Sequence, residues 1–396
     1  MINNKKTIII IGGSQSHVPF ITSANNLGYN TVVFDIDDDC KGAKVADIFY
    51  KISTHDFDNI LLKCLELNEK SKISAVITCS SSTLPLIIVS KICHKLDLLS
   101  YSLESVKLST NKLLMKNYFV NKGISTPEWI VTDNEYDAIN FIKKIEDKLI
   151  IKPSSGSQGS KGVNLINIDS DISKIIKNSK EHSSDSQVLI ERYYMGQEYS
   201  VDGIVIGKKP IILSISKKYN LGPKYNFTMC GFYMEKILNN KILNNDYSSI
   251  IENSTKAVKA MNISNSFFSV DIILTKKGPF VLECGVLLDC KIDRLLYHSG
   301  IDIYSLFINT ITGNKINYDN VFNNKDLYLN FLFSPKQGQL NINKNEVKNF
   351  DGIIEWESAD GSLVKPPNSI SDTIGWIITK RKLNIEYENN LYFSIK

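Results

Sequence analysis

The amino-acid sequence predicts a mixed α/β and α+β fold that begins with a parallel α/β domain and ends with a small β-rich subdomain. Apolar runs alternate with helical patterns over about the first hundred residues, as in βαβ units. Residues 262–284 hold two apolar runs joined by the turn "TKKG", as in a β-hairpin. After about residue 325, short strand patterns alternate with glycine and proline turn signals.

The α/β domain is expected to start at "TIIIIGG", because an apolar run that ends in a glycine turn is typical of a buried strand. A helix should follow, since Val18, Ile21, Ala24 and Leu27 recur at helical intervals before Gly28. Two further strands and a second helix are expected at "TVVFDID", "AVITC" and "LPLIIVSKICHKL".

The glycine turn at Gly12 and Gly13 does not predict a dinucleotide site. Asp35 stands about where the ribose acid of such a site would be, but the third glycine of G-x-G-x-x-G is missing. A nicotinamide cofactor is therefore not expected. Open α/β sheets bind ligands at the carboxyl ends of their strands, so His17 stays a candidate for substrate contact, although a structural role is favoured.

Length and composition are those of an ordinary globular protein with two or three domains. The chain has 396 residues, of which 43% are apolar and 22% charged. A net charge of +4 is too small to predict a nucleic-acid partner. The apolar run near the N-terminus is too short for a targeting segment or a membrane span. Seven cysteines without a C-x-x-C pair predict reduced thiols, a cytoplasmic location and no structural zinc site.

The central part of the chain should combine helices and strands. One helix is expected over 103–122, with Met115 and Phe119 among its apolar positions and Gly123 as its stop. Extended structure should restart after Pro127. Residues 124–210 are expected to form a small α+β unit, with another strand in "QVLIERYYMGQEYSVDGIVIG".

The stretch "LIIKPSSGSQGSKGVNLI" joins an apolar strand that carries Lys152 to a loop rich in glycine and serine. Gly156, Gly159 and Gly162 would let backbone N–H groups face an anion, and lysines would add charge, so a polyphosphate is one candidate ligand. The stretch is not a P-loop, because its key lysine precedes the glycines. Taken alone, the stretch favours a surface hairpin, because glycine and serine are ordinary turn residues.

Four carboxylates follow the glycine-rich stretch. Glu191 and Glu198 lie on either side of a short turn, and Asp271 and Glu283 lie on the two strands of the expected hairpin. Facing residues of a hairpin share one side of the sheet, so Asp271 and Glu283 could come together. Two neighbouring carboxylates repel each other unless a cation lies between them. Mg²⁺ binds one or two carboxylates together with phosphate oxygens, which fits the lysine and glycine pattern upstream.

The chain resembles the ATP-grasp superfamily, specifically its carboxylate–amine ligase branch. The resemblance rests on the order of its motifs: the lysines, the glycine loop, the E-x6-E pair and the hairpin acids. The resemblance covers residues 103 to 300 or so. It implies an N-terminal α/β domain over 1–102 and an ATP-grasp domain over 103–315, with a mobile lid subdomain at about 124–195. Residues 316–396 would then be the C-terminal β-rich subdomain.

The resemblance implies a phosphate and metal site. Lys112 and Lys152 look like the two lysines that hold the α- and β-phosphates of ATP, and the loop from Ser154 to Gly162 looks like the lid over the triphosphate. Asp271 and Glu283 match the acidic pair that carries Mg²⁺, or Mn²⁺ in its place.

The same resemblance implies contacts with the nucleoside. Glu191 looks like the residue that takes the adenine amino group, the main chain near Tyr194 like the partner of the ring nitrogen, and Glu198 like the acid on the ribose. The residues expected to bind ATP are Lys112, Lys152, Ser155, Gly156, Ser157, Gly159, Glu191, Tyr194, Glu198 and Leu282.

One segment departs from the family pattern. Members usually carry E-x-N-x-R or E-x-G-x-R at the second metal carboxylate, whereas "ECGVLLDCKIDR" lacks the asparagine and the arginine at those places. We expect Arg294 or Lys291 to supply the missing positive charge and Asp289 an oxygen. Lys218 aligns with a lysine that faces the terminal phosphate or the substrate, although Lys217 leaves the register open. The expected catalytic residues are thus Arg294, Lys291 and Lys218.

Each residue also has a plainer explanation when it is taken singly. Lys112 would be a solvated helix lysine, Glu191 and Glu198 surface acids, and Asp271 a turn cap. Their ordered combination favours the functional interpretation.

The expected activity is that of an ATP-dependent ligase. It would activate a small-molecule carboxylate as an acyl phosphate for attack by an amine, releasing ADP and phosphate. Three alternatives stay open: a biotin-carboxylase-like or other bicarbonate-using enzyme, a catalytically altered ATP-binding module and, as a distant third, a nicotinamide oxidoreductase, against which the missing G-x-G-x-x-G argues. No nucleic acid or membrane partner is expected. A homodimer is expected only because homodimers are the commonest oligomers of soluble proteins.

Overall fold

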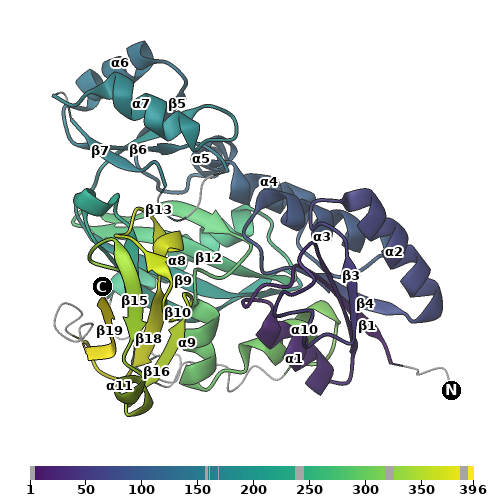
Figure 1. Cartoon of the computed structure of the whole chain (residues 1–396). Helices are drawn as coiled ribbons and strands as arrows, with labels where there is room; N and C mark the ends of the chain where they lie inside the picture. Colours follow the sequence, from purple (N-terminus) through teal and green to yellow (C-terminus); the bar gives the residue numbers. More distant parts are fainter. Residues whose placement is uncertain are drawn as a thin grey trace.

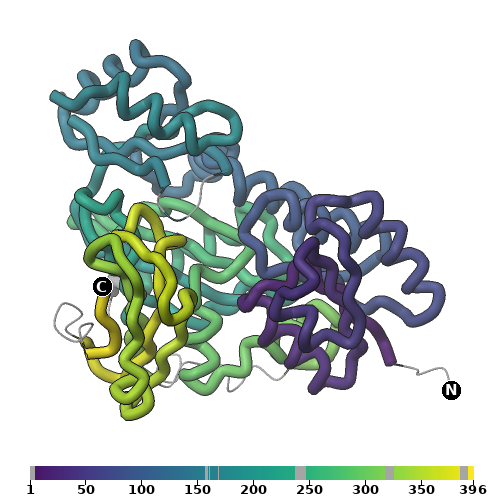
Figure 2. Tube along the Cα trace, viewed as in Figure 1, coloured from purple at the N-terminus to yellow at the C-terminus, as the bar shows by residue number. Residues whose placement is uncertain are grey.

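The structure is a computed structural model that describes residues 5–156, 159, 161–167, 169–236, 245–316, 325–383 and 391–396. Its elements form a parallel N-terminal sheet, a small upper sheet, a long central sheet and a short C-terminal sheet (Figure 1). The purple N-terminal segments lie at one side of the molecule, and the yellow C-terminal segments lie beside the green central ones (Figure 2).

The N-terminal sheet confirms the predicted parallel α/β domain. Its strand order is β3-β2-β1-β4, with all pairs parallel. Ile8 and Ile10 of β1 pack with helix α1, whereas Ile9 and Ile11 pack with α2 and α3 on the opposite face, so the strand is buried throughout. The elements are β1 (Thr7–Ile11), α1 (Val18–Asn26), β2 (Asn30–Asp35), β3 (Ile48–Lys51), α2 (Phe57–Lys70), β4 (Ile73–Ile77) and α3 (Thr83–Lys95).

The single helix expected over 103–122 is wrong, because the chain forms α4 (Leu103–Thr110) and α5 (Lys112–Asn121). Asn111 between them is extended, with φ −129° and ψ 109°, and its side chain accepts a hydrogen bond from the backbone of Leu114. Asn111 is a good N-cap residue, so the sequence favours a new helix start here. The break places Lys112 in the first turn of α5, where its backbone N–H donates to the carbonyl of Ser154 at 2.9 Å.

The upper sheet has the order β5-β8-β6-β7 and its own apolar core with two helices. This upper sheet lies at the top of Figure 1, apart from the long central sheet. Its elements are β5 (Trp129–Thr132), α6 (Glu135–Ile145), β6 (Leu149–Pro153), β7 (Asn164–Ile166), α7 (Ile172–Glu181) and β8 (Val188–Arg192). The stretch from Gln187 to Gly207, in which a strand and a short turn were expected, holds two strands: β8 in this sheet and β9 in the central sheet.

The central sheet has eight strands in the order β13-β12-β9-β10-β11-β14-β18-β16. The predicted hairpin is confirmed as β12 (Ser266–Thr275) and β13 (Gly278–Gly285), with Asp271 directly opposite Glu283. The other strands are β9 (Gln197–Ile206), β10 (Lys209–Asn220), β11 (Met229–Met234), β14 (Leu327–Leu332), β16 (Ile353–Trp356) and β18 (Gly375–Thr379). Buried residues of α8 (Asn245–Ala260) pack in one core of this sheet, and those of α9 (Ile292–Ser299) and α10 (Ile303–Ile311) pack in the other.

The C-terminal part is rich in strands, as predicted, and three of its strands continue the central sheet. The rest forms a three-stranded sheet in the order β17-β15-β19. The remaining elements are the 3-10 turn η1 (Pro223–Tyr225), β15 (Gly338–Ile342), α11 (Lys344–Lys348), β17 (Leu363–Val364), the 3-10 turn η2 (Ile370–Asp372) and β19 (Phe393–Ile395).

Candidate active site

A cavity of about 880 Å³ lies where the upper sheet, the central sheet and the loops of the N-terminal sheet meet. Side chains far apart in the sequence share its wall. Among the predicted site residues, those lining it are Lys112, Lys152, Gly156, Gly159, Glu191, Tyr194, Glu198, Lys218, Asp271, Leu282, Glu283, Lys291 and Arg294. Ser155 does not line the cavity, because its hydroxyl lies 2.9 Å from the hydroxyl of Ser184. Ser157 lies outside the described residues.

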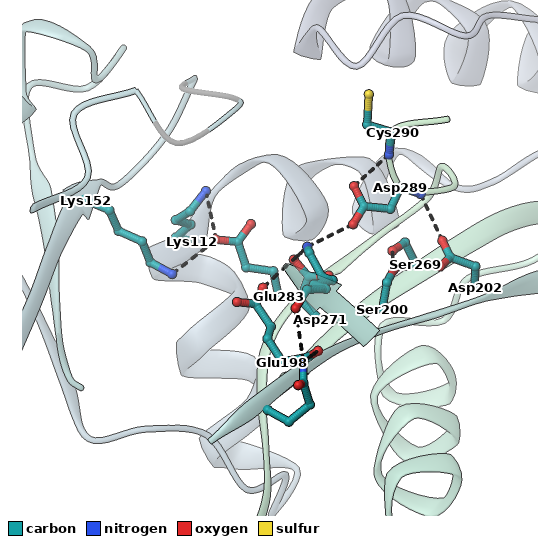
Figure 3. A network of polar contacts seen from close by, with 12 residues as sticks. Lys112, Lys152, Glu198, Ser200, Asp202, Ser269, Asp271, Glu283, Asp289 and Cys290 are labelled. Atoms are coloured by element: carbon teal, nitrogen blue, oxygen red, sulfur yellow. Dashed lines mark hydrogen bonds and ion pairs between the residues drawn. The ribbon is translucent and has the colours of Figure 1, made fainter. Parts of the chain in front are cut away.

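Lysines surround two carboxylates at one end of the cavity. Lys152 Nζ lies 2.7 Å from Glu191 Oε2 and 3.2 Å from Glu283 Oε1. Lys112 Nζ lies 3.5 Å from the same Glu283 oxygen (Figure 3). Burial opposes ionisation of Glu283, but Lys112 and Lys152 outweigh it and hold the pKa of this carboxyl well below its usual range. The result is a group of ammonium ions held at the edge of the cavity.

Lys116 is a member of this group that was not predicted from the sequence. Its Nζ pairs with the second oxygen of Glu191 and donates to the hydroxyl of Thr126 at 2.6 Å. Burial, only partly offset by Glu191, lowers the pKa of Lys116. The sequence contained a signal that Lys116 shares a helix face with Lys112. Lys116 lies one helical turn after Lys112, between the buried residues Met115 and Phe119.

Glu191 is only 2% exposed, which removes the surface-acid explanation. Burial disfavours its charged form, but Lys116 and Lys152 outweigh this and lower the pKa of Glu191. Each of its two oxygens pairs with one of these lysines. The carboxylate therefore holds two lysines in position. Its contact with an adenine amino group stays a prediction.

A second network of charges lies beside the first on the central sheet. Lys218 of β10 lies 2.8 Å from Asp271 Oδ2, 2.9 Å from Asp289 Oδ2 and 3.4 Å from Glu198 Oε1. These three carboxylates form the acid cluster, and their side chains turn toward one another in Figure 3. Burial raises the pKa of Asp271 well above its usual value, although Lys218 counteracts it. One ammonium ion thus neutralises part of a strongly acidic site.

Asp202 holds the backbone next to the acid cluster. Its side chain is fully buried, accepts a hydrogen bond from the hydroxyl of Ser200 at 2.6 Å, and accepts another from the backbone N–H of Asp289 at 2.9 Å. Burial, with a contribution from the neighbouring Asp289, raises the pKa of Asp202 to about 7. The hydrogen bond that the backbone N–H of Asp289 donates to Asp202 fixes the backbone that carries Asp289.

The acid cluster fits a divalent cation. One of its oxygens, Asp271 Oδ1, is buried and has no hydrogen bond or ion pair among the described residues, and Asp289 Oδ2 has Lys218 as its partner. Within the part of the chain that the structure describes, no three His, Cys, Asp or Glu side chains form a complete metal site. Mg²⁺ does not need one, because it binds one or two protein carboxylates together with water and substrate phosphates.

Lys291 and Arg294 both line the cavity, but their partners differ. Lys291 Nζ lies 2.6 Å from Glu357 Oε1 and above the ring of Trp376, so the C-terminal part holds it. Arg294 Nε lies 3.5 Å from Asp293 Oδ2. In the described ranges, the two terminal nitrogens of Arg294 have no hydrogen bond or ion pair. Arg294 is therefore the freer of the two expected cations.

Tyr194 and Leu282 lie at the lysine end of the cavity. The Tyr194 ring stacks on Phe280 with centroids 4.5 Å apart. Gly196 follows in a tight turn, where an added Cβ would lie 2.3 Å from the carbonyl oxygen of Leu274. This turn carries the chain from the upper sheet into β9 and Glu198.

The glycine loop touches the C-terminal part of the chain. Gly156 and Gly159 have φ of +73° and +67°, values that side chains disfavour. A Cβ on Gly159 would lie 2.4 Å from Cγ2 of Ile370, whose backbone N–H donates to the Gly159 carbonyl at 3.3 Å. Ile370 also lines the cavity, a contact not predicted from the sequence.

The far end of the cavity lies at the carboxyl ends of β1 and β4, where Ser16, Thr78 and Cys79 line the wall. His17 is not among the lining residues. Its ring accepts a hydrogen bond from the backbone of Cys79 at 3.0 Å and lies 2.9 Å from the hydroxyl of Ser14. Burial lowers the pKa of His17 to about 4, so the neutral ring holds the two loops together. Asp35 accepts from the backbone of Gly13 at 2.7 Å, which is also a structural role.

Within the described ranges, every helix is too short or too polar to span a membrane.

Residues 109–285 match the sequence model of a family described as the ATP-grasp domain. The large chain of carbamoyl phosphate synthase from Pyrococcus furiosus is 24% identical over 189 residues, which are 48% of this chain and 17% of that protein. The chain thus spans only a small part of the length of this curated relative.

Solved structures share the fold over nearly the whole chain. An L-amino acid ligase from Bacillus licheniformis is similar with a TM-score of 0.79, 17% identity and 99% coverage of each chain. The biotin carboxylase domain of 2-oxoglutarate carboxylase from Hydrogenobacter thermophilus, solved with MgADP and bicarbonate, gives a TM-score of 0.75, 14% identity and coverage of 99% and 90%. Phosphoribosylglycinamide synthetase from Anaerococcus prevotii gives 0.72, 17% identity and 99% coverage of each chain. The chain therefore has the fold of these enzymes, and its residues 109–285 are similar to the ATP-grasp domain.

Proposed function

We propose that the protein is an ATP-dependent carboxylate–amine ligase. The observation that carries this proposal is the common cavity, which joins a lysine group and a glycine loop at one end to an acid cluster and an arginine at the other. A triphosphate needs the cations, a divalent metal needs the acids, and an organic anion needs the arginine.

In this proposal Lys112 and Lys152 hold the α- and β-phosphates of ATP. Both lie at Glu283, so their ammonium groups are already ordered before ATP arrives. Lys116 and Glu191 act as positioning residues, because they fix Lys152 without having to contact the nucleotide. Pre-ordered charges stabilise a developing negative charge without reorganising during the reaction.

The remaining ATP contacts follow the resemblance. Glu198 would take the ribose hydroxyls, and the main chain near Tyr194 the adenine ring. Gly156 and Gly159 would let the loop close over the phosphates and keep water from the reaction.

We propose that Asp271 and Glu283 hold Mg²⁺. Asp289 would take the place of the motif asparagine, which this chain lacks. The unpartnered buried oxygen of Asp271 supports this assignment, as does the position of Asp289 at the same lysine, Lys218. When bound, Mg²⁺ or Mn²⁺ would neutralise phosphate charge near the transferred group. Lys218 lies at the same carboxylates and would face the terminal phosphate.

The reaction has two steps that balance without a nucleophilic side chain. A carboxylate oxygen attacks the γ-phosphorus, the bond to the β-phosphate oxygen breaks, and ADP leaves. The amine nitrogen then attacks the acyl carbon, phosphate leaves, and the nitrogen gives up a proton. The first step brings two anions together, and at an effective dielectric near 20 their repulsion is on the order of 4 kcal/mol at 4 Å. Arg294 and Lys218 reduce this repulsion, while the site mainly positions the reactants.

A coupled assay of ADP release tests the proposal. Acids and amines are supplied in pairs, and the ligase predicts ADP release that requires both. A biotin-carboxylase-like activity is the second candidate, because the fold is shared with a domain solved with bicarbonate. It predicts release stimulated by bicarbonate without an amine. A nucleotide-binding module predicts binding of AMP-PNP, a non-hydrolysable ATP analogue, with no ADP release under any condition. A homodimer and a cytoplasmic location stay predictions.

A further inference from the structure

The far half of the cavity combines an apolar wall with one pair of opposite charges. Phe20, Phe267 and Phe307 line it, and their rings pack together with centroids 4.2 Å apart for Phe267 and Phe307 and 5.8 Å apart for Phe20 and Phe307. All three side chains are at least nine-tenths buried. Such a wall offers contact area to an apolar group and no hydrogen-bond partner to a polar one.

The opposite charges belong to Asp293 and Arg294 in the first turn of α9. The carboxylate of Asp293 lies 3.5 Å from Arg294 Nε and accepts a hydrogen bond from the hydroxyl of Tyr304 at 2.9 Å. Their side chains are 19% and 13% exposed, and both line the cavity. Tyr304 also packs edge-on against Phe20, with centroids 4.8 Å apart, so the charged pair adjoins the apolar wall.

Arg294 has unused binding capacity. Within the residues described, its ion pair with Asp293 uses Nε and leaves the two terminal nitrogens without a partner. A guanidinium group recognises a carboxylate through two parallel hydrogen bonds. Lys291, the neighbouring cation, is held by Glu357 and is less able to take this role.

An α-amino acid carries a carboxylate and an ammonium group on one carbon atom, so its two charges are as close as those of Asp293 and Arg294. We infer that this half of the cavity binds an α-amino acid with an apolar side chain as the acid substrate. Arg294 holds its carboxylate, Asp293 holds its ammonium group, and the aromatic wall receives its side chain. An acidic side chain would bring a second anion toward Asp293, which disfavours dicarboxylic amino acids.

The inference rests on the proposed function for the reaction, but the binding of the amino acid can be measured by itself. Three probes separate the contacts. L-Phenylalanine has both charged groups, 3-phenylpropionate lacks the ammonium group, and 2-phenylethylamine lacks the carboxylate. Their affinities are measured by calorimetry on the full chain with saturating AMP-PNP and Mg²⁺.

Each variant should weaken only the probes that carry the charged group it contacts. Asp293→Asn should weaken L-phenylalanine about 10-fold or more and leave 3-phenylpropionate within about twofold, because a charge-assisted bond is lost only where the ammonium group is present. Arg294→Gln should weaken L-phenylalanine and 3-phenylpropionate to a similar degree and spare 2-phenylethylamine. L-Glutamate should bind more weakly than L-phenylalanine to the unchanged protein.

Two controls separate binding from folding. Tyr304→Phe removes the hydrogen bond to Asp293 but keeps its charge, so it should retain the discrimination among the probes. Lys256→Gln removes a charge from an exposed helix residue whose ion pair is with Glu252, and should change no affinity. AMP-PNP should bind all variants equally.

The inference is overturned if Asp293→Asn weakens all three probes alike or weakens none. It is also overturned if ADP release is fastest with acids that have no amino group, a result that leaves the proposed ligase intact. The reverse result, charge-dependent binding of L-phenylalanine with no ADP release for any amine, keeps the subsite and removes the ligase.

Discussion

Asp271 and Glu283 face each other across the β12–β13 hairpin, yet different lysines hold their carboxylates. Asp271 pairs with Lys218, whereas Glu283 pairs with Lys112 and Lys152. One hairpin therefore connects the acid cluster to the lysine group. A metal bound at this pair would lie between the lysine group and the end of the cavity that we propose for the substrate.

Lys116 should matter for stability because it is a fully buried charge with a carboxylate partner. Lys116→Met leaves Glu191 with Lys152 alone, and breaking a buried pair typically costs about 3–5 kcal/mol. Urea unfolding should show a loss of this size. The matched double variant Lys116→Met with Glu191→Gln should lose less than the sum of the single variants. A loss below about 1 kcal/mol for Lys116→Met would show that the pair is not a structural support.

Asp289 should strengthen metal binding. Asp289→Ala removes one carboxylate oxygen from the acid cluster, so the Mn²⁺ affinity measured by electron paramagnetic resonance with AMP-PNP should fall about 10-fold, or about 1.4 kcal/mol. Asp293→Asn is the matched control, because it removes a carboxylate from the same segment but outside the cluster. Equal Mn²⁺ affinity in Asp289→Ala and the unchanged protein would assign the cation to the hairpin acids alone.

Gly159→Ala should slow turnover more than it weakens AMP-PNP binding, because a Cβ at this position meets Ile370 and would disturb closure of the loop. Gly207→Ala is the control, since Gly207 has a similar φ of +60° but open space around it. Both changes carry the strain of a left-handed alanine, on the order of 1 kcal/mol. Ile370→Ala should restore part of the turnover in the Gly159→Ala protein. An equal loss of turnover in Gly159→Ala and Gly207→Ala would argue against a role for the contact between Gly159 and Ile370.

His17 should make stability depend on pH. Its pKa is about 4 in the folded chain because of burial, below the ordinary value of 6.5. Between these values the unfolded chain binds more protons, so the free energy of unfolding should fall as pH drops from about 6.5 to 4. The change approaches about 1.4 kcal/mol for each unit of the pKa difference. Denaturant unfolding at several pH values should show a flatter profile for His17→Gln, and parallel profiles would exclude His17 as the cause.

The parts of the fold that local patterns control were predictable from the sequence. The isoleucine run of β1 and the β12–β13 hairpin have clear periodicity, and the register that opposes Asp271 and Glu283 follows from that hairpin. The break at Asn111 was missed because the helical pattern continues across it, and a capping side chain outweighs that pattern locally.

Contacts between distant segments could not be predicted in the same way. The pairs Lys291–Glu357 and Gly159–Ile370 join residues that only the folded sheet order brings together. The position of Glu191 between two lysines depends on the packing of α5 against the upper sheet, which no spacing in the sequence specifies. Whether these residues bind ATP stays a prediction.

A crystal structure with AMP-PNP and Mn²⁺, measured at the manganese absorption edge, is the decisive experiment. The proposal predicts an anomalous peak within coordination distance of Asp271 and Glu283, with the triphosphate between that peak and Lys112 and Lys152. A nucleotide bound with its phosphates away from these lysines, or a manganese peak at other carboxylates, would contradict it.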